Sequence, residues 1–165
     1  MKRDVVLIAH DLRSCHNVGS LLRTADGLGV KTVFLTGYTP FPMNPKDTRL
    51  PHMAQKIHAQ IHKTALGAEN HVPWEHSHDS MGIIHQLKAT GYQICALEQH
   101  DSSQMLPSYT APSKVALLIG REVEGIDPLL LKLTDICLEI PMGGKKESFN
   151  VVQAAAMALY QFRFH

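Results

Sequence analysis

Short apolar runs alternate with amphipathic stretches along the whole chain. The runs are continuous and rich in β-branched residues, which is typical of strands buried on both faces of a parallel sheet. They are Val5–Ala9, Lys31–Leu35, Tyr92–Leu97, Lys114–Ile119 and Ile136–Ile140, with a further short strand expected within Ala68–Pro73. Helical spacing is found in Leu21–Leu28, His52–Leu66, Ser80–Ala89 and a C-terminal segment that ends near Phe162. The alternation predicts one α/β domain, residues 1–165, with a mainly parallel sheet flanked by helices.

Proline and capping residues indicate where helices begin and where the chain forms loops. Asp127 and Pro128 are a favourable N-cap and first-turn pair, so a short helix is predicted from there to Leu133. Tyr38–Pro51 contains four prolines and Glu98–Pro112 is polar, so both segments are predicted to be long loops.

The last helix, VVQAAAMALYQF, is apolar around most of its circumference. Ser148 and Asn150 are both suitable N-caps for it, and the sequence does not choose between them. A helix with this pattern is buried on more than one side. Because so small a domain cannot easily cover it, the pattern predicts that the helix packs against a second copy in a homodimer.

Composition restricts the kind of RNA or DNA binding that the chain can perform. Hydrophobic residues make up 44% and charged residues 19%, and the formal net charge is +1. This is not the bulk positive charge of a nonspecific nucleic-acid binder. Any basic surface must therefore be local or assembled from two subunits.

The cysteines and histidines argue against a disulfide framework or a metal site. Cys15, Cys95 and Cys137 are far apart and form no CxxC pair. His58 and His62 have helical i, i+4 spacing, but no carboxylate or cysteine set completes a metal site. Reduced thiols, the lack of a signal-peptide pattern and the lack of about 18 consecutive apolar residues predict a soluble cytoplasmic protein without a membrane partner.

Three polar, glycine-containing loops follow predicted strands, which is where α/β domains bind ligands. They are Ser14–Ser20, Gly120–Gly125 and Pro141–Asn150. Taken singly, each is compatible with ordinary turns and caps. No GxGxxG follows the first strand and no GK[ST] is present, so a small nucleotide-binding oxidoreductase or a P-loop protein is not supported.

Together and in this order, the loops resemble the three motifs of the SpoU-type, TrmH-like branch of the SPOUT RNA methyltransferases. The matching segments are Asn17–Gly19 with Leu22–Ala25, Leu118–Glu122 running to Gly125–Ile126, and Ile140–Gly143 with Ser148–Val151. The middle region, Leu66–Ala68 with Val72–Pro73, is also similar, so the resemblance covers essentially the whole chain. Phe149 stands where the family usually has leucine.

The resemblance implies an α/β knot, in which roughly residues 136–162 thread through a loop, and a homodimer with cofactor sites near its interface. S-adenosylmethionine would lie in the knotted cleft. The backbone that holds it would come from Leu97, Gly120, Ile140, Met142 and Phe149. Arg23 would be catalytic, in its own subunit or across the dimer. The residues that orient Arg23 and the RNA would be Asn17, Glu122, Ser148 and Asn150.

The implied reaction is methylation of a ribose 2′-hydroxyl in RNA, with transfer RNA favoured over ribosomal RNA. Arginine is a poor base because its side chain stays protonated, so Arg23 either stabilises developing alkoxide charge or positions a phosphate that accepts the proton. Candidate phosphate contacts are Lys145, Lys146, Arg13, Arg49, Lys46 and Arg121. The alternative is a noncatalytic RNA-binding relative, which loss of the arginine would favour; Arg23, Glu122 and Asn150 are all present.

Overall fold

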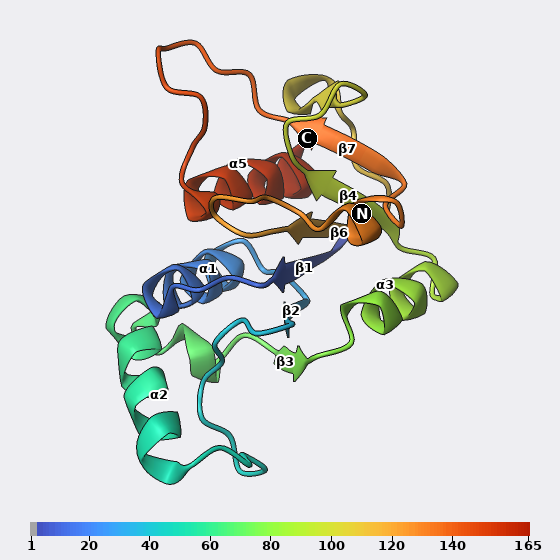
Figure 1. Cartoon of the computed structure of the whole chain (residues 1–165). Helices are drawn as coiled ribbons and strands as arrows, with labels where there is room; N and C mark the ends of the chain where they lie inside the picture. Colours follow the sequence, from blue (N-terminus) through green and yellow to red (C-terminus); the bar gives the residue numbers. More distant parts are fainter. Residues whose placement is uncertain (1–2) are drawn as a thin grey trace.

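The computed structural model describes residues 3–165, which form a seven-stranded sheet with the strand order β3-β2-β1-β6-β4-β7-β5 (Figure 1). The strands are β1 (Asp4–His10), β2 (Thr32–Thr36), β3 (Trp74–Ser77), β4 (Gln93–Leu97), β5 (Gln104–Met105), β6 (Lys114–Ile119) and β7 (Ile136–Glu139). The helices are α1 (Cys15–Gly27), α2 (Pro51–Ala65), α3 (Ser80–Ala89), α4 (Pro128–Leu131) and α5 (Val151–Phe164). All strand pairings within the sheet are parallel, so the carboxyl ends of neighbouring strands meet at one edge.

Helices cover both faces of the sheet, which explains why the strands are continuously apolar. Along β1, Val5 and Leu7 join the core under α1, α2 and α5. The intervening Val6 and Ile8 join the core under α3 and α4. Figure 1 shows α1 and α5 on one side of the sheet and α3 on the other. The fold is therefore a three-layer α/β arrangement, as the apolar pattern predicts.

Several predicted boundaries are confirmed. The strand Lys114–Ile119 and the helix Ser80–Ala89 have the predicted ends. The Asp127 carboxylate accepts a hydrogen bond from the backbone N–H of Leu129 at 2.8 Å, although α4 ends at Leu131 rather than Leu133. Asn150, not Ser148, caps α5: its side-chain oxygen accepts from the backbone N–H of Val152 at 2.9 Å.

The strand expected within Ala68–Pro73 is wrong: a short 3-10 turn occupies Ala68–Asn70, and β3 begins at Trp74. The buried Glu69 carboxylate accepts from the backbone N–H of Gly67 at 3.0 Å, and the Trp74 indole donates to the Glu69 carbonyl at 3.0 Å. These contacts hold the segment as a tight turn, a tertiary arrangement that local propensity cannot reveal.

The loop predicted for Glu98–Pro112 also contains regular structure, namely the short strand β5 and a 3-10 turn at Leu106–Ser108. β5 pairs with β7, which lies more than thirty positions later in the sequence, through Gln104 opposite Leu138. β5 has only two residues, Gln104 and Met105, and both are exposed at the edge of the sheet, so no apolar run identifies it in the sequence.

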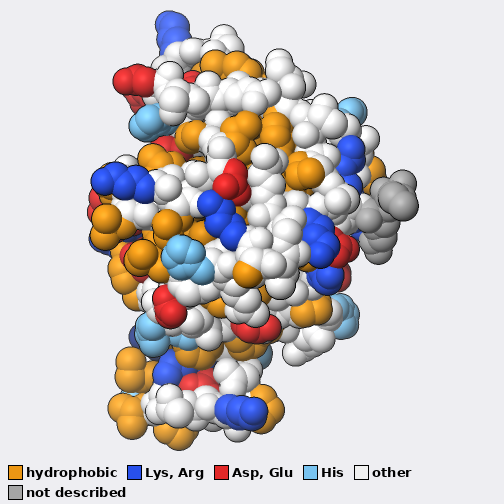
Figure 2. Space-filling view, turned by 90° about the vertical axis from the view of Figure 1, so that its right-hand side faces the viewer, with side chains coloured by type: hydrophobic (Ala, Val, Ile, Leu, Met, Phe, Trp, Pro, Cys, Tyr) orange, Lys and Arg blue, Asp and Glu red, His pale blue; other side chains and the backbone are white. Residues whose placement is uncertain are grey.

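The surface is mixed in charge, and α5 leaves apolar side chains uncovered. Figure 2 shows acidic and basic side chains interspersed over the face that carries α3. On α5, Leu159 and Phe162 are buried, whereas Met157, Tyr160 and Phe164 are 36%, 53% and 59% exposed. Within residues 3–165, no helix has the length and apolarity required to span a membrane. The knot that the resemblance implies remains a prediction.

Candidate functional site

A cleft of about 290 Å³ opens at the carboxyl ends of three adjacent strands, β6, β4 and β7. The side chains and backbone that line it come from the strand ends, from the loops that follow them and from the first turn of α5. They include Leu97–Gln99, Ile119–Gly125, Leu138–Ile140, Met142, Glu147–Phe149, Val151 and Ala154. Its volume is near the lower end of the range for small-molecule sites, about 300–1,000 Å³, and its position is where parallel α/β sheets bind ligands.

The loop after β6 is a tightly closed wall of the cleft. The backbone groups of Arg121 and Gly125 exchange two hydrogen bonds, both 3.1 Å long. Gly125 has a positive φ of 74°, and a Cβ on Gly120 would lie 2.6 Å from the Gly125 carbonyl oxygen and from backbone atoms of Ile126. Both positions therefore require glycine for the loop to close upon itself. The loop presents a rigid backbone to the cleft.

Glu98 joins the loops after β4 and β6, a role that sequence reasoning missed. One carboxylate oxygen accepts from the backbone N–H of Ile126 at 2.9 Å and the other from that of Gln99 at 3.0 Å. The only sequence signal for this role was a carboxylate directly after a predicted strand.

The loop from β7 to α5 forms a more open wall of the cleft than the loop after β6. Residues 143–149 are exposed, and the Gln99 side-chain amide donates to the Glu147 carbonyl at 2.6 Å.

The structure brings together all the residues that the family resemblance associates with the cofactor. The cleft-lining members of that set are Leu97, Gly120, Ile140, Met142 and Phe149. Leu97 at the end of β4 and Ile140 and Met142 in the loop after β7 contribute apolar side chains, and Phe149 adds an aromatic ring that is 40% exposed. Their role in holding a cofactor stays a prediction.

The predicted catalytic residues are divided between the cleft and its surroundings. Glu122 and Ser148 line the cleft, and the Asn17 amide donates to the Glu122 carboxylate at 3.1 Å. Asn150 is beside it as the N-cap of α5. Arg23 lies on the exposed side of α1, about 9 Å along the helix axis from Asn17. Within residues 3–165 it does not line the cleft, and no hydrogen bond or ion pair engages its guanidinium.

His10, which is buried, lies at the carboxyl end of β1. The His10 Nδ1 is 3.0 Å from the Thr36 hydroxyl, and its Nε2 is 3.1 Å from the Asp11 carboxylate. Burial lowers the pKa of His10 despite the Asp11 charge, so the neutral imidazole is favoured near neutral pH.

Arg49, a candidate phosphate contact, serves a different role. Its guanidinium donates to the Asp47 carboxylate at 2.5 and 2.8 Å and to the carbonyls of Phe41 and Pro42, and it lies 3.6 Å from the centre of the Phe41 ring. The hydrogen bonds from Arg49 lower the pKa of Asp47 to about 2. Because its donors are engaged and its side chain is only 19% exposed, Arg49 stabilises the loop between β2 and α2 rather than presenting a free cation to RNA.

Two histidines of α2, His58 and His62, take part in local contacts. His62 lies 2.5 Å from the buried Glu69 carboxylate, and His58 accepts from the backbone N–H of Met43 at 3.2 Å. In the described part of the chain, no group of three or more histidine, cysteine, aspartate or glutamate side chains is arranged to hold a metal ion.

Known proteins with similar sequences are methyltransferases. The chain is 31% identical over 160 residues to the 23S rRNA (guanosine(2553)-2′-O)-methyltransferase RlmP of Bacillus subtilis, which covers 96% of this chain and 57% of that protein. It is also 31% identical to the 23S rRNA (guanosine-2′-O-)-methyltransferase RlmB of Nitrosomonas europaea, covering 98% of this chain and 56% of that protein. The chain thus spans little more than half the length of these curated relatives.

Solved structures share the fold. An AdoMet-bound rRNA methyltransferase from Sinorhizobium meliloti superposes with a TM-score of 0.81 at 21% identity, over 98% of this chain and 56% of that one. A structure described as giving insights into 2-OH methylation of C/U34 on tRNA superposes with a TM-score of 0.75 at 22% identity, over 96% and 93% of the two chains. The sequence profile of the SpoU rRNA Methylase family matches residues 4–160. The chain therefore belongs to the SpoU rRNA methylase family.

Proposed function

We propose that this protein is a cytoplasmic methyltransferase that uses S-adenosylmethionine to methylate a ribose 2′-hydroxyl of RNA. The observation that supports this most strongly is the cleft at the ends of β6, β4 and β7, where residues from the second and third family motifs meet. Two of the curated relatives are named as 2′-O-methyltransferases of guanosine in 23S rRNA. We favour transfer RNA as the substrate because two solved relatives are described as a tRNA modifying enzyme and in terms of 2-OH methylation of C/U34 on tRNA.

The chemistry of the lining fits a cationic cofactor. Arg121 is the basic residue among the side chains that line the cleft. Five lining residues are glutamates, namely Glu98, Glu122, Glu124, Glu139 and Glu147. S-adenosylmethionine carries a sulfonium and an ammonium group, and carboxylates attract both. The same carboxylates would repel the phosphates of a dinucleotide. Leu97, Ile140 and Met142 offer apolar walls for an adenine ring.

When bound, S-adenosylmethionine supplies an electrophilic methyl group. The protein must place the ribose hydroxyl in line with it and stabilise the charge that develops as the hydroxyl proton leaves. Arg23 is suited to this because its guanidinium remains charged and is not engaged by the neighbouring side chains described. Asn17 and Glu122, joined at 3.1 Å, connect α1 to the cleft and would orient the substrate.

Arg23 does not line the cleft of its own chain, so we infer that a second copy of the chain supplies it. A groove of about 450 Å³ runs along the uncovered face of α5, between Leu106, Pro107, Met157 and Tyr160. Ile140 lines both this groove and the cleft. A partner seated on α5 would therefore be adjacent to the cofactor, and it would bury apolar side chains that one chain leaves exposed.

The decisive test is transfer of a tritium-labelled methyl group to bulk transfer RNA and ribosomal RNA in the presence of chelator, followed by nucleoside mapping. We expect 2′-O-methylated nucleosides from transfer RNA. Binding of cofactor and RNA without transfer would instead support a noncatalytic RNA-binding relative. Transfer that requires added zinc or magnesium would contradict the metal-free mechanism.

A further inference from the structure

The turn after β2 displays an aromatic ring that the proposed mechanism does not use. Tyr38 is 52% exposed. The other exposed aromatic side chains within residues 3–165 have apparent uses: Phe149 lines the cleft, and Tyr160 and Phe164 lie on the uncovered face of α5. Tyr38 instead lies beyond the carboxyl end of β2, at the same edge of the sheet as the cleft.

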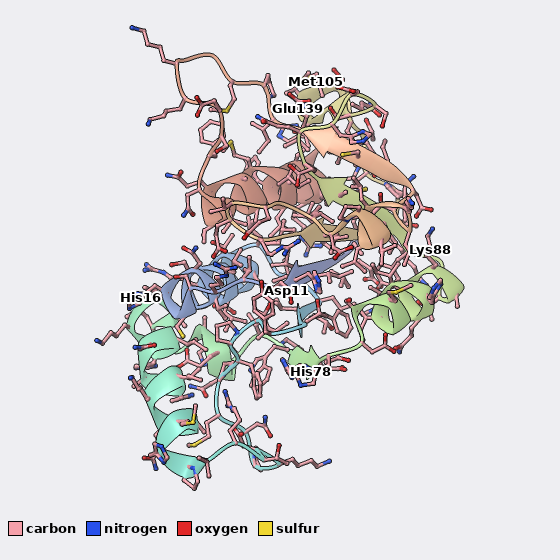
Figure 3. All side chains as sticks on the ribbon, in the orientation of Figure 1. Asp11, His16, His78, Lys88, Met105 and Glu139 are labelled. Atoms are coloured by element: carbon pink, nitrogen blue, oxygen red, sulfur yellow. The ribbon has the colours of Figure 1, made fainter. Side chains whose placement is uncertain are left out.

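The backbone beneath Tyr38 is firmly held. The N–H of Tyr38 donates to the Asp11 carboxylate at 3.0 Å, and the N–H of Asp11 donates to the Thr36 carbonyl at 3.1 Å. Gly37 has a positive φ of 68° and donates to the Ser77 carbonyl at 3.0 Å. Asp11 itself has a positive φ of 56°, a conformation that non-glycine residues rarely adopt. Figure 3 shows Asp11 at the end of β1. The ring is thus presented on a strained but rigid support.

A cation lies beside the ring and connects it to the cleft. Arg13 follows two residues after Asp11, whose carboxylate holds the Tyr38 backbone. In agreement with this placement, the Tyr38 side chain and the Glu124 charge raise the pKa of Arg13. The Arg13 guanidinium is 3.4 Å from the Glu124 carboxylate, and its side chain is 69% exposed. Glu124 lines the cleft. Arg13 therefore lies between the β2 turn, which Asp11 holds, and Glu124 at the proposed cofactor site.

We propose that Tyr38 and Arg13 form a platform that stacks one unpaired base of the RNA and binds an adjacent phosphate. Single-stranded RNA is recognised through bases stacked on aromatic rings and through arginine contacts to the backbone. A rigid ring loses little conformational freedom on binding, so the support from Asp11 favours this use. The proposal rests on the proposed function. It specifies that the RNA next to the methylated ribose is an unpaired loop rather than a duplex.

The test compares Tyr38→Ala and Tyr38→Phe in binding a fluorescent single-stranded oligoadenylate of about 12 nucleotides and an RNA duplex of equal length. We expect Tyr38→Ala to bind the single strand about tenfold more weakly, whereas Tyr38→Phe keeps the stacking face and wild-type affinity. Arg13→Ala should lower the salt dependence of binding by about one phosphate contact. Met81→Ala, an exposed apolar truncation on α3, is the matched control and should change nothing.

The outcomes separate this platform from the methyltransferase proposal. Cofactor affinity and melting temperature should be unchanged in Tyr38→Ala, while the KM for transfer RNA rises with little change in kcat. If wild-type protein methylates transfer RNA and Tyr38→Ala does so with an unchanged KM, the platform is wrong and the function stands. Equal binding of the oligoadenylate by wild type and Tyr38→Ala, or a wild type that binds only the duplex, also overturns the platform. An absence of methyl transfer by wild type, with the Tyr38 effect on binding intact, contradicts the function alone.

Discussion

The cofactor cleft and the surface around Arg23 differ in how complete they are within one chain. Every predicted cofactor residue lines the cleft, and the loops around it are joined by the Glu98 carboxylate and by the closed turn between Arg121 and Gly125. Arg23, by contrast, is exposed on α1 and outside the cleft. One chain thus assembles the residues predicted to bind the cofactor, whereas it leaves Arg23, the predicted catalytic residue, outside the cleft.

This difference separates two properties that variants can test independently. Cofactor affinity should depend on the loops of a single chain. Methyl transfer should depend in addition on Arg23 and on the contact between two chains. A substitution that lowers cofactor affinity and methyl transfer equally would indicate that the cleft and the surface around Arg23 function together as a single site.

The largest effect is expected from Arg23→Ala. Removing a positioned charge from the transition state should slow methyl transfer by roughly a hundredfold or more, while cofactor affinity, folding and dimerisation stay close to wild type. Arg23→Lys should rescue poorly because an ammonium lacks the planar fork of donors. Single-turnover methylation at saturating RNA and cofactor measures this. Near-normal turnover by Arg23→Ala would make Arg23 an ordinary surface arginine.

Mixing variants tests whether Arg23 acts across the dimer. When Arg23→Ala is mixed with a cofactor-site variant such as Gly120→Val, each heterodimer has one intact cleft facing one intact arginine. Activity should then recover to about a quarter of wild type for an equal, randomly assorted mixture. Two inactive variants that stay inactive after subunit exchange would place Arg23 in its own subunit.

Disrupting the predicted dimer should also reduce methyl transfer more than cofactor binding. Met157→Glu places a charge in the groove on α5, where the side chain is 36% exposed, so the single chain can still fold. We expect a monomer in sedimentation, with methyl transfer reduced about as much as in Arg23→Ala and cofactor binding weakened far less. Gln153→Glu, an exposed position on α5 outside that groove, is the control. A stable monomer of wild-type protein at micromolar concentration would contradict the dimer.

A smaller effect is expected within the cleft. Gly120→Ala introduces a Cβ 2.6 Å from the Gly125 carbonyl, and backbone must move to make room. We expect a loss of about 1–3 kcal/mol in the free energy of unfolding, with cofactor affinity about tenfold lower by calorimetry. Gly27→Ala is the matched control, because a Cβ there meets nothing within 4 Å. Unchanged affinity in Gly120→Ala would mean that the β6 loop does not contact the cofactor.

The smallest effect concerns the loop between β2 and α2, which does not line the cleft. Arg49 lowers the pKa of Asp47 to about 2 from 3.8, so the ionised carboxylate favours the folded state. This stabilisation is present above about pH 4 and is lost as the pH falls toward about 2. Asp47→Asn should therefore melt at a lower temperature than wild type at pH 7, and the difference should shrink between those pH values. Cofactor binding at pH 7 should not change. A difference that is constant with pH would contradict the Arg49–Asp47 contact.

Local patterns predicted most elements because they reflect local physics. Lys114–Ile119 and Ser80–Ala89 agree with their predicted bounds, since burial on two faces and helical amphipathicity leave a direct record in the residues. The short strand β5 and the turn at Ala68–Asn70 escaped prediction. Both depend on partners distant in sequence or on side-chain hydrogen bonds, such as the pairing of Gln104 with Leu138.

The sequence by itself determined the α/β class and the motif loops after β6 and β7, because strand burial, glycine and capping residues act over a few neighbouring positions. The loop predicted for Ser14–Ser20 is wrong, because Ser14 caps α1 and the helix already begins at Cys15. Only the tertiary structure decided that β4 lies between β6 and β7. That order depends on long-range pairing and on packing of both sheet faces, for which no local pattern is specific. It brings Leu97, Gly120 and Ile140 around one cleft and leaves Arg23 outside it.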